Sequence, residues 1–211
     1  MKKGIPRATV QRLPLYLQCL DECVKDHDRI SSEDLAGRAG VNSAKVRKDL
    51  SYLGSFGVRG VGYDPENLRF QIRRELGLTQ EWPLVIVGIG NLGRALVNFE
   101  GFRAQGFRVV GLFDNDPNKI GFRLNGSVVE PLERLGDAIR ERGAAIGVIA
   151  TPAVAAQEVA DLLAAAGVKS ILNFAASVIK VPDGAQVRRV DFSTELQVLA
   201  FYLHREQTGS G

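Results

Sequence analysis

Three glycines with fixed spacing stand between a predicted buried strand and a predicted helix. Gly88, Gly90 and Gly93 form the pattern Gly-x-Gly-x-x-Gly directly after the apolar run LVIV. The first glycine allows a tight turn, the second lets the backbone approach a pyrophosphate, and the third lets the helix pack against the strand. The N–H groups at the start of the helix then bind the phosphates. The residues expected to hold a dinucleotide here are Gly88, Ile89, Gly90, Asn91, Leu92 and Gly93.

An acidic residue at the end of the next predicted strand adds a group that binds ribose. The run FRVVGLFDND predicts a strand ending at Asp114, which lies 21 residues after Gly93. A carboxylate there bonds the adenosine ribose hydroxyls and repels a 2′-phosphate, so the sequence favours NAD over NADP. Asp116 is a weaker candidate, which we interpret as the cap of a short following helix.

Further βα units extend the predicted sheet. The runs AAIGVIAT, KSILNFA and QVRRVDF predict strands, and PAVAAQEVADLLAAAG predicts a helix between the first two. Ligands of open α/β sheets bind at the carboxyl ends of the strands. Thr151 and Pro152 are therefore candidates to approach a nicotinamide, although a plain helix-starting turn explains them nearly as well.

The nucleotide-binding half lacks the groups that hydride transfer normally uses. Such an enzyme usually needs an acid or base for the substrate proton, but this half has no histidine before His204 and no Tyr-x-x-x-Lys pattern. The βα units use nearly all of residues 82–192, which leaves no substrate domain. We therefore expect no catalytic residue and no metal site, and a nucleotide that is sensed rather than consumed.

Positive charge is concentrated in the first eighty residues. They hold 14 Lys and Arg against 10 Asp and Glu, whereas residues 81–211 hold 13 against 14. This imbalance is expected of a segment that meets a polyanion, although an excess of four is modest. The two cysteines, Cys19 and Cys23, lie four apart in one predicted helix and are interpreted as buried thiols, with a redox pair or metal ligands as alternatives.

The spacing of caps and apolar residues within this first segment predicts a helix-turn-helix. Ser31 and Asp34 form a capping box, Gly40 ends that helix, and Asn42 or Ser43 caps the next one. Two short helices joined by a tight glycine-containing turn make this motif. The run SFGVRGVGYD then predicts a hairpin wing, and PENLRFQIRRELGL predicts a closing helix.

One face of the second helix of this motif carries the groups that could contact DNA. Val46, Leu50 and Leu53 fall on the side expected to face the core, and the cations lie opposite. Arginine can grip guanine with two hydrogen bonds, and lysine or serine can bond base edges or phosphate. A solvated charged face is the alternative. The residues expected to contact DNA are Ala44, Lys45, Arg47, Lys48, Ser51 and, in the wing, Arg59.

The last predicted helix, STELQVLAFYLHREQ, is apolar almost all round. A terminal helix with so little polar surface should be buried by a partner subunit. The chain has no run of eighteen apolar residues, as a membrane span requires, and no signal peptide is recognisable at its start. We therefore expect a cytoplasmic protein that does not contact a membrane.

The sequence resembles the Rex family of redox-sensing transcriptional repressors along nearly its whole length. The strings that carry the resemblance are IPRATVQRLPLYL, VRKDLSYLG, GVGYD, GNLGRAL, FDNDPNKIG, ILNFA and VDFSTELQ. The resemblance implies a homodimer that binds operator DNA when NAD⁺ dominates and releases it when NADH binds. It also implies a C-terminal helix exchanged between subunits, with Phe192 approaching the nicotinamide from the exchanged segment. Phe99 stands where a tyrosine is expected, and Ala176 where a proline is usual.

The sequence thus predicts an α/β protein with three parts: a winged helix-turn-helix domain (1–79), a Rossmann-type parallel-sheet domain (80–192) and an exchanged C-terminal helix (193–211). The expected regulatory ligand is NADH or NAD⁺, and the expected partner is double-stranded operator DNA with an inverted repeat. Two alternatives stay open. One is a Rossmann oxidoreductase with an accessory DNA-binding domain, and the other is a repressor that responds to a different adenine nucleotide.

Overall fold

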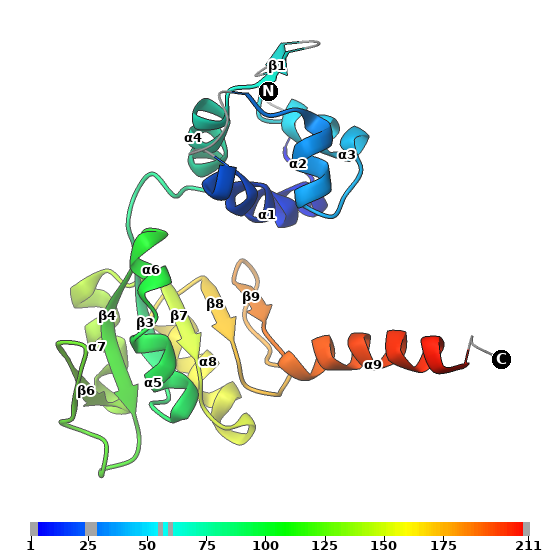
Figure 1. Ribbon diagram of the computed structural model, residues 1–211. Coiled ribbons are helices and arrows are strands. Elements are labelled where there is room, and N and C mark those ends of the chain that lie inside the picture. Colours follow the sequence, from blue (N-terminus) through cyan, green and yellow to red (C-terminus); the bar gives the residue numbers. More distant parts are fainter. Residues whose placement is uncertain (1–3, 24–28, 55–56, 59–60, 209–211) are drawn as a thin grey trace. The chain divides into compact units, whose positions relative to one another are not determined.

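The computed structural model describes residues 4–23, 29–54, 57–58 and 61–208. The chain forms two compact units, residues 1–80 and 81–211, and each is described by itself (Figure 1).

The second unit is built on a mostly parallel sheet. Within its described residues the strand order is β5-β6-β4-β3-β7-β8-β9, and only β5 pairs antiparallel with its neighbour. From β6 to β9 this is the strand order of the doubly wound dinucleotide-binding fold, as predicted. The strands are β3 (Trp82–Val87), β4 (Phe107–Asp114), β5 (Arg123–Leu124), β6 (Ser127–Pro131), β7 (Ile146–Ile149), β8 (Ser170–Asn173) and β9 (Gln186–Arg189).

Helices connect these strands and cover the sheet. They are α5 (Asn91–Val97), α6 (Glu100–Ala104), α7 (Leu135–Arg142) and α8 (Ala156–Ala165), with 3₁₀ turns at η1 (Leu132–Arg134) and η2 (Ala153–Ala155). Val85 and Val87 of β3 pack with residues of α7 and α8, whereas Leu84 and Ile86 pack with Val97 of α5. The alternating side chains of β3 therefore serve two cores. The helix predicted after Asp116 is wrong: residues 117–121 form a turn, in which the Asp116 carboxylate accepts the Asn118 N–H at 3.0 Å.

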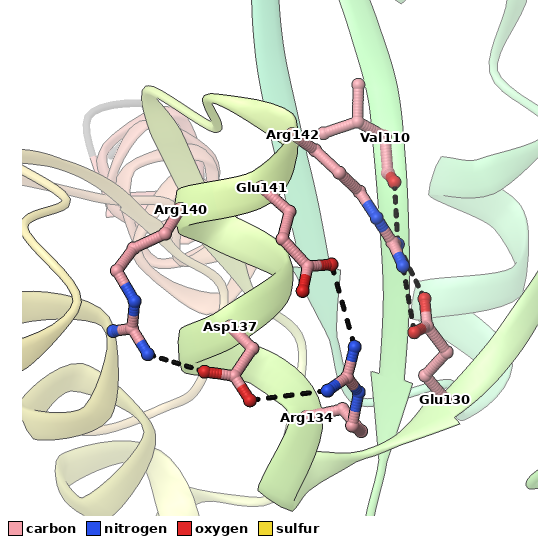
Figure 2. A network of polar contacts seen from close by, with 7 residues as sticks. All are labelled: Val110, Glu130, Arg134, Asp137, Arg140, Glu141 and Arg142. Atoms are coloured by element: carbon pink, nitrogen blue, oxygen red, sulfur yellow. Dashed lines mark hydrogen bonds and ion pairs between the residues drawn. The ribbon is translucent and has the colours of Figure 1, made fainter.

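The end of α7 is fastened to the sheet by Arg142. Its guanidinium donates to both carboxylate oxygens of Glu130 in β6, at 2.5 and 2.9 Å, and to the carbonyl of Val110 in β4 at 3.0 Å (Figure 2). The hydrogen bonds to Glu130 raise the pKa of Arg142. Two parallel N–H···O bonds also fix direction, so α7 ends in register with two neighbouring strands.

The long C-terminal helix α9 (Phe192–Thr208) leaves the sheet beyond β9 and runs away from it (Figure 1). Every residue of α9 is exposed, although Leu196, Leu199 and Phe201 are large and apolar. The predicted terminal helix is thus present and is not buried by its own chain, while its exchange between subunits stays a prediction. Within the described residues, no helix is long and apolar enough to cross a membrane.

The first unit is a bundle of short helices with a small hairpin. Its elements are α1 (Arg7–Cys23), α2 (Ser32–Arg38), α3 (Ser43–Ser51), β1 (Gly57–Val58), β2 (Gly62–Tyr63) and α4 (Pro65–Glu75). β1 and β2 pair antiparallel, and Tyr63 exchanges two backbone hydrogen bonds with Ile30 ahead of α2. Cys19 is buried, as predicted, while the side chain of Cys23 lies outside the described residues.

The predicted helix caps are confirmed. The Ser31 side chain accepts the backbone N–H of Asp34, and the Asp34 carboxylate accepts that of Ser31, which completes the capping box. Gly40 has a φ of +62°, the left-handed conformation expected where a helix ends. Asn42 caps α3 by accepting the N–H of Lys45 at 2.8 Å.

A buried carboxylate joins α3 to α1. Asp49 is 2% exposed and accepts hydrogen bonds from Thr9 Oγ1 at 2.8 Å, from Arg12 at 2.6 and 2.8 Å, and from Tyr16 Oη at 2.8 Å. Burial alone would raise the pKa of Asp49, but these bonds outweigh it and hold the pKa below its usual range. Burial and the Asp49 bond raise the pKa of Tyr16 to about 12. Since all three donors lie on α1, Asp49 fixes the rotation of α3 about its axis.

We predict that Asp49→Asn destabilises the first unit by about 2–4 kcal/mol, because it removes the charge that three donors face. Denaturant unfolding of the full chain, followed by circular dichroism, measures this. Asp21→Asn is the matched control, since Asp21 pairs with Arg69 at 3.2 Å in a partly exposed bridge and should cost less than about 1 kcal/mol.

The difference between wild type and Asp49→Asn should also depend on pH. The folded-state pKa of Asp49 is depressed, so the stabilisation is present above the unfolded value of about 3.9 and is lost as pH falls through the folded value. Equal unfolding free energies for the two proteins at neutral pH would contradict the role given to this carboxylate.

Candidate functional site

The order of the strands creates one position where a ligand can enter between two connections. From β3 the chain proceeds outward through β4 to β6, then crosses back to β7 on the other side of β3. The connections after β3 and β7 therefore diverge to opposite faces of the sheet, and ligands of such sheets bind in this crevice. Gly88 directly follows β3 and Thr151 follows β7 at the same edge. The structure thus brings the glycine loop and the Thr151–Pro152 loop together.

Backbone atoms make the closest contacts of two glycines at this edge. A Cβ atom on Gly93 would lie 1.9 Å from the Gly88 carbonyl oxygen, and one on Gly88 would lie 2.7 Å from the Ala150 carbonyl carbon. Gly88 also has a φ of +96°. Gly90 differs, because a Cβ there meets no atom within 4 Å. Two of the three glycines therefore serve packing, while Gly90 leaves open space in front of the loop.

Asp114 ties the glycine loop to the loop after β4. Its carboxylate accepts the Ile89 N–H at 2.7 Å and the Asp116 N–H at 2.9 Å, and only 5% of the residue is exposed. Burial by itself raises the pKa of Asp114, but the hydrogen bonds from Asp116 and Ile89 outweigh this effect and hold the pKa below its usual range, so the group is a stable carboxylate. The Ile89 side chain is buried, so only its backbone faces the loop.

A cation that sequence reasoning did not assign stands beside Asp114. The ammonium of Lys119 lies 3.1 Å from Asp114 Oδ2 and 3.7 Å from Asp116 Oδ2. A turn brings Lys119 back toward the strand end, since its N–H donates to the Asp116 carbonyl. The five-residue spacing from Asp114 is the only signal in the sequence that could have suggested this pair.

A hydroxyl and two aromatic rings lie after the carboxyl ends of β7, β8 and β9. Thr151 Oγ1 is buried and has no hydrogen-bond partner among the described residues. Phe192, the first residue of α9, is 63% exposed, and its ring centroid lies 6.4 Å from that of Phe174 after β8. Asp191 holds this helix start by accepting from Ser193, which with Arg189 lowers its pKa to about 2. A buried hydroxyl without such a partner after β7, and the exposed ring of Phe192 near Phe174 after β8, are suited to a ligand ring that carries a polar group.

The two positions at which the sequence departs from the family pattern are both on the surface. Phe99 is 57% exposed and packs edge-to-face on Phe102, with centroids 5.2 Å apart. Ala176 is exposed in the loop between β8 and β9. A phenyl ring at residue 99 cannot donate a hydrogen bond, so any polar link through this position is absent.

In the first unit, α3 presents the face that was expected to contact DNA. Val46, Leu50 and Leu53 are buried. The residues that form the outer face of α3 are all exposed: Ala44, Lys45, Arg47, Lys48 and Ser51. Arg47 donates to Ser32 Oγ at 3.0 Å and to Glu33 Oε1 at 2.9 Å, which directs its guanidinium toward the start of α2. Arg59 lies outside the described residues.

An apolar hollow of about 300 Å³ lies on one face of the sheet, in the second unit. Its lining comes from the strands β3, β4, β7, β8 and β9 and from α6: Leu84, Phe102, Phe107, Ile146, Val148, Ser170, Ile171, Leu172, Gln186 and Arg188. The sheet is thus less covered here than where α7 and α8 pack against it.

Family models match both units separately. Residues 4–51 match the putative DNA-binding protein N-terminus, and residues 79–177 match the CoA binding domain.

Curated relatives match the chain along nearly its whole length. The redox-sensing transcriptional repressor Rex of Streptomyces coelicolor is 59% identical over 97% of this chain and 80% of its own. That of Carboxydothermus hydrogenoformans is 48% identical over 96% of this chain and 98% of its own. These relatives are repressors, so the oxidoreductase alternative is not supported.

Solved structures of one repressor have the same fold. RSP in complex with β-NAD⁺ and operator DNA superposes with a TM-score of 0.91 at 35% identity, over 99% of this chain and 97% of that chain. RSP with β-NADH superposes with a TM-score of 0.90 at 34% identity, over 99% of both chains. The chain belongs to the Rex family of redox-sensing transcriptional repressors.

Proposed function

We propose that this protein senses NADH and NAD⁺ at the β3–β7 edge and transmits the ligand's redox state to operator DNA bound by α3. The observation that carries the proposal is the glycine loop: backbone packing at Gly88 and Gly93 leaves open space at Gly90, beside a buried carboxylate at the end of β4. The relative RSP has been crystallised with β-NAD⁺ and operator DNA and with β-NADH, which supports the choice of ligands.

The proposed ligand position assigns a role to each end of the edge. The pyrophosphate lies against residues 88–93, and the adenosine ribose lies near Asp114. The nicotinamide then extends toward Thr151 and Pro152, where the buried Thr151 hydroxyl would find the partner that it lacks among the described residues. Phe192 is placed at the same end by the start of α9.

The outer face of α3 is proposed as the surface that enters the major groove. Lys45 and Lys48 are exposed cations suited to phosphate, and Arg47 is suited to a guanine edge. Contact with Ser32 and Glu33 restricts the Arg47 guanidinium before DNA arrives. Arg59 is retained as a proposed contact from the wing.

A homodimer is proposed because α9 and the apolar hollow complement each other. α9 exposes Leu196, Leu199 and Phe201, and none of its residues is buried in its own unit. The hollow over β7 and β8 is lined mainly by apolar side chains of the sheet, and among its lining residues only Phe102 comes from a helix. An α9 from a second copy, exchanged between subunits, would bury both surfaces, and a two-fold dimer would make the operator an inverted repeat.

The direction of the switch is proposed as release of DNA by NADH. A ligand shifts an equilibrium only through its different affinities for the two states. A dimer must fit both half-sites at once, so a change in the separation of its two α3 helices can remove half of the contacts.

Gly90→Ala should lower NADH affinity at least about tenfold, because the new methyl group occupies the space left for the pyrophosphate. Stability should change by less than about 1 kcal/mol, since the φ of −81° suits alanine but Gly90 is the N-cap of α5, where alanine is less favourable than glycine. Calorimetric titration and thermal unfolding measure the two effects. Gly93→Ala is the contrasting variant, which should lose stability through its clash with the Gly88 carbonyl. Wild-type NADH affinity in Gly90→Ala would contradict the proposed ligand position.

Operator DNA should weaken NADH binding by the same factor by which NADH weakens operator binding. We expect about ten- to a hundredfold, which corresponds to about 1.4–2.8 kcal/mol of coupling. NADH affinity is measured with and without saturating operator, obtained by selection from random duplexes, and with a scrambled duplex as control. The same NADH affinity in all three conditions would show that redox sensing does not act through DNA-binding equilibrium.

Leu199→Glu should raise the dimer dissociation constant at least about tenfold, because a charge would enter an apolar interface. Gln197→Glu adds the same charge on the opposite side of α9, at a residue that is already polar, and serves as the control. Sedimentation equilibrium measures both. If Leu199→Glu dimerises as wild type does, α9 is not the dimer interface.

A further inference from the structure

The ammonium of Lys119 partly neutralises the carboxylate expected to read the adenosine ribose. Lys119 Nζ lies 3.1 Å from Asp114 Oδ2 and 3.7 Å from Asp116 Oδ2, so the three side chains together carry one net negative charge rather than two. The Lys119 side chain is 28% exposed, whereas Asp114 is nearly buried. An approaching phosphate therefore meets the Lys119 cation more directly than the Asp114 carboxylate, while the Asp116 carboxylate, with a side chain that is 37% exposed, is accessible as well.

The acceptor capacity of Asp114 is largely used within the protein. Oδ2 accepts from both Ile89 and Lys119, and Oδ1 accepts from Asp116. Each carboxylate oxygen accepts about two hydrogen bonds, so Asp114 keeps one acceptor position for a ribose hydroxyl. Lys119, with three donors, adds hydrogen-bonding capacity toward an anionic group at the same place.

We infer that Lys119 limits how strongly the site discriminates between adenine dinucleotides with and without a 2′-phosphate. Asp114 and Asp116 disfavour the phosphate, and Lys119 offsets part of this repulsion. This inference rests on the proposed nucleotide site and concerns its adenosine end. The alternative role for Lys119 is a clip that only holds the turn after β4. The ratio of the affinities for the two kinds of dinucleotide distinguishes these roles.

The test uses ADP-ribose and 2′-phospho-ADP-ribose as probes, because both lack the nicotinamide ring and so report on the adenosine end alone. Calorimetry on the full chain gives the ratio of their affinities. Lys119→Gln should increase the preference for ADP-ribose about two- to fivefold, the range of a partly exposed charge pair. Lys119→Arg should restore the wild-type ratio, and added salt should shrink the difference between variants.

Lys169→Gln is the matched control, because it removes the same charge at the amino end of β8, the opposite edge of the sheet. It should leave the ratio unchanged. If Lys119→Gln weakens both probes equally, Lys119 is only a clip and the inference is overturned. If Lys169→Gln shifts the affinity ratio as much, the change in the net charge of the protein explains the shift, and the inference again fails. Failure of wild type to bind ADP-ribose and NADH would instead refute the proposed nucleotide site.

Discussion

The architecture of the second unit depends on one close backbone approach, between the Gly88 carbonyl and the Cα of Gly93. No side chain fits there, because a Cβ on Gly93 would lie 1.9 Å from that oxygen. The same turn brings Gly88 against the Ala150 carbonyl at the end of β7. At this turn β3, α5 and β7 therefore approach one another through backbone atoms, beside the side-chain core that they share. This contact sets the slope at which α5 leaves the sheet, and with it the direction of the N–H groups that would face a phosphate.

Two buried carboxylates hold separate loops and helices together, as the glycines hold the strand ends together. A buried charge is costly unless donors surround it, so Asp49 and Asp114 each gather groups from separate elements. Asp49 draws three side chains of α1 onto α3 and thereby turns the outer face of α3 toward solvent. Asp114 draws the glycine loop and the turn after β4 together. In both units, a buried carboxylate therefore positions a surface that is proposed to bind an anionic ligand: DNA in the first unit and the dinucleotide in the second.

Features that depend on residues close together in the sequence were predicted correctly from local patterns. The capping box at Ser31, the left-handed Gly40 and the glycine spacing each follow from residues within a few positions of one another, and the parallel sheet follows from repeated βα periods. The Arg47–Glu33 and Lys119–Asp114 pairs did not emerge, because charged residues are frequent and only the fold selects which of them meet. The turn after Asp116 was mistaken for a helix because a cap and a proline are common to both. The role of Arg59 and the exchange of α9 stay predictions, since they concern groups outside the described residues and a second chain.

The position of the ligand's reactive ring constrains where redox sensing can arise. NADH and NAD⁺ differ only in the nicotinamide, which is neutral in one and cationic in the other, so the adenosine end near Asp114 and Lys119 affects the affinity of both forms nearly equally. Any difference in affinity between NADH and NAD⁺ that drives a switch must therefore come from the nicotinamide end of the ligand. In the proposed site, this end lies in the region of Thr151, Phe174 and Phe192. Phe192 is also the first residue of α9. A nicotinamide that displaces its ring would therefore act directly on the start of the helix proposed to join two subunits, without requiring a chain of intermediate residues through the sheet.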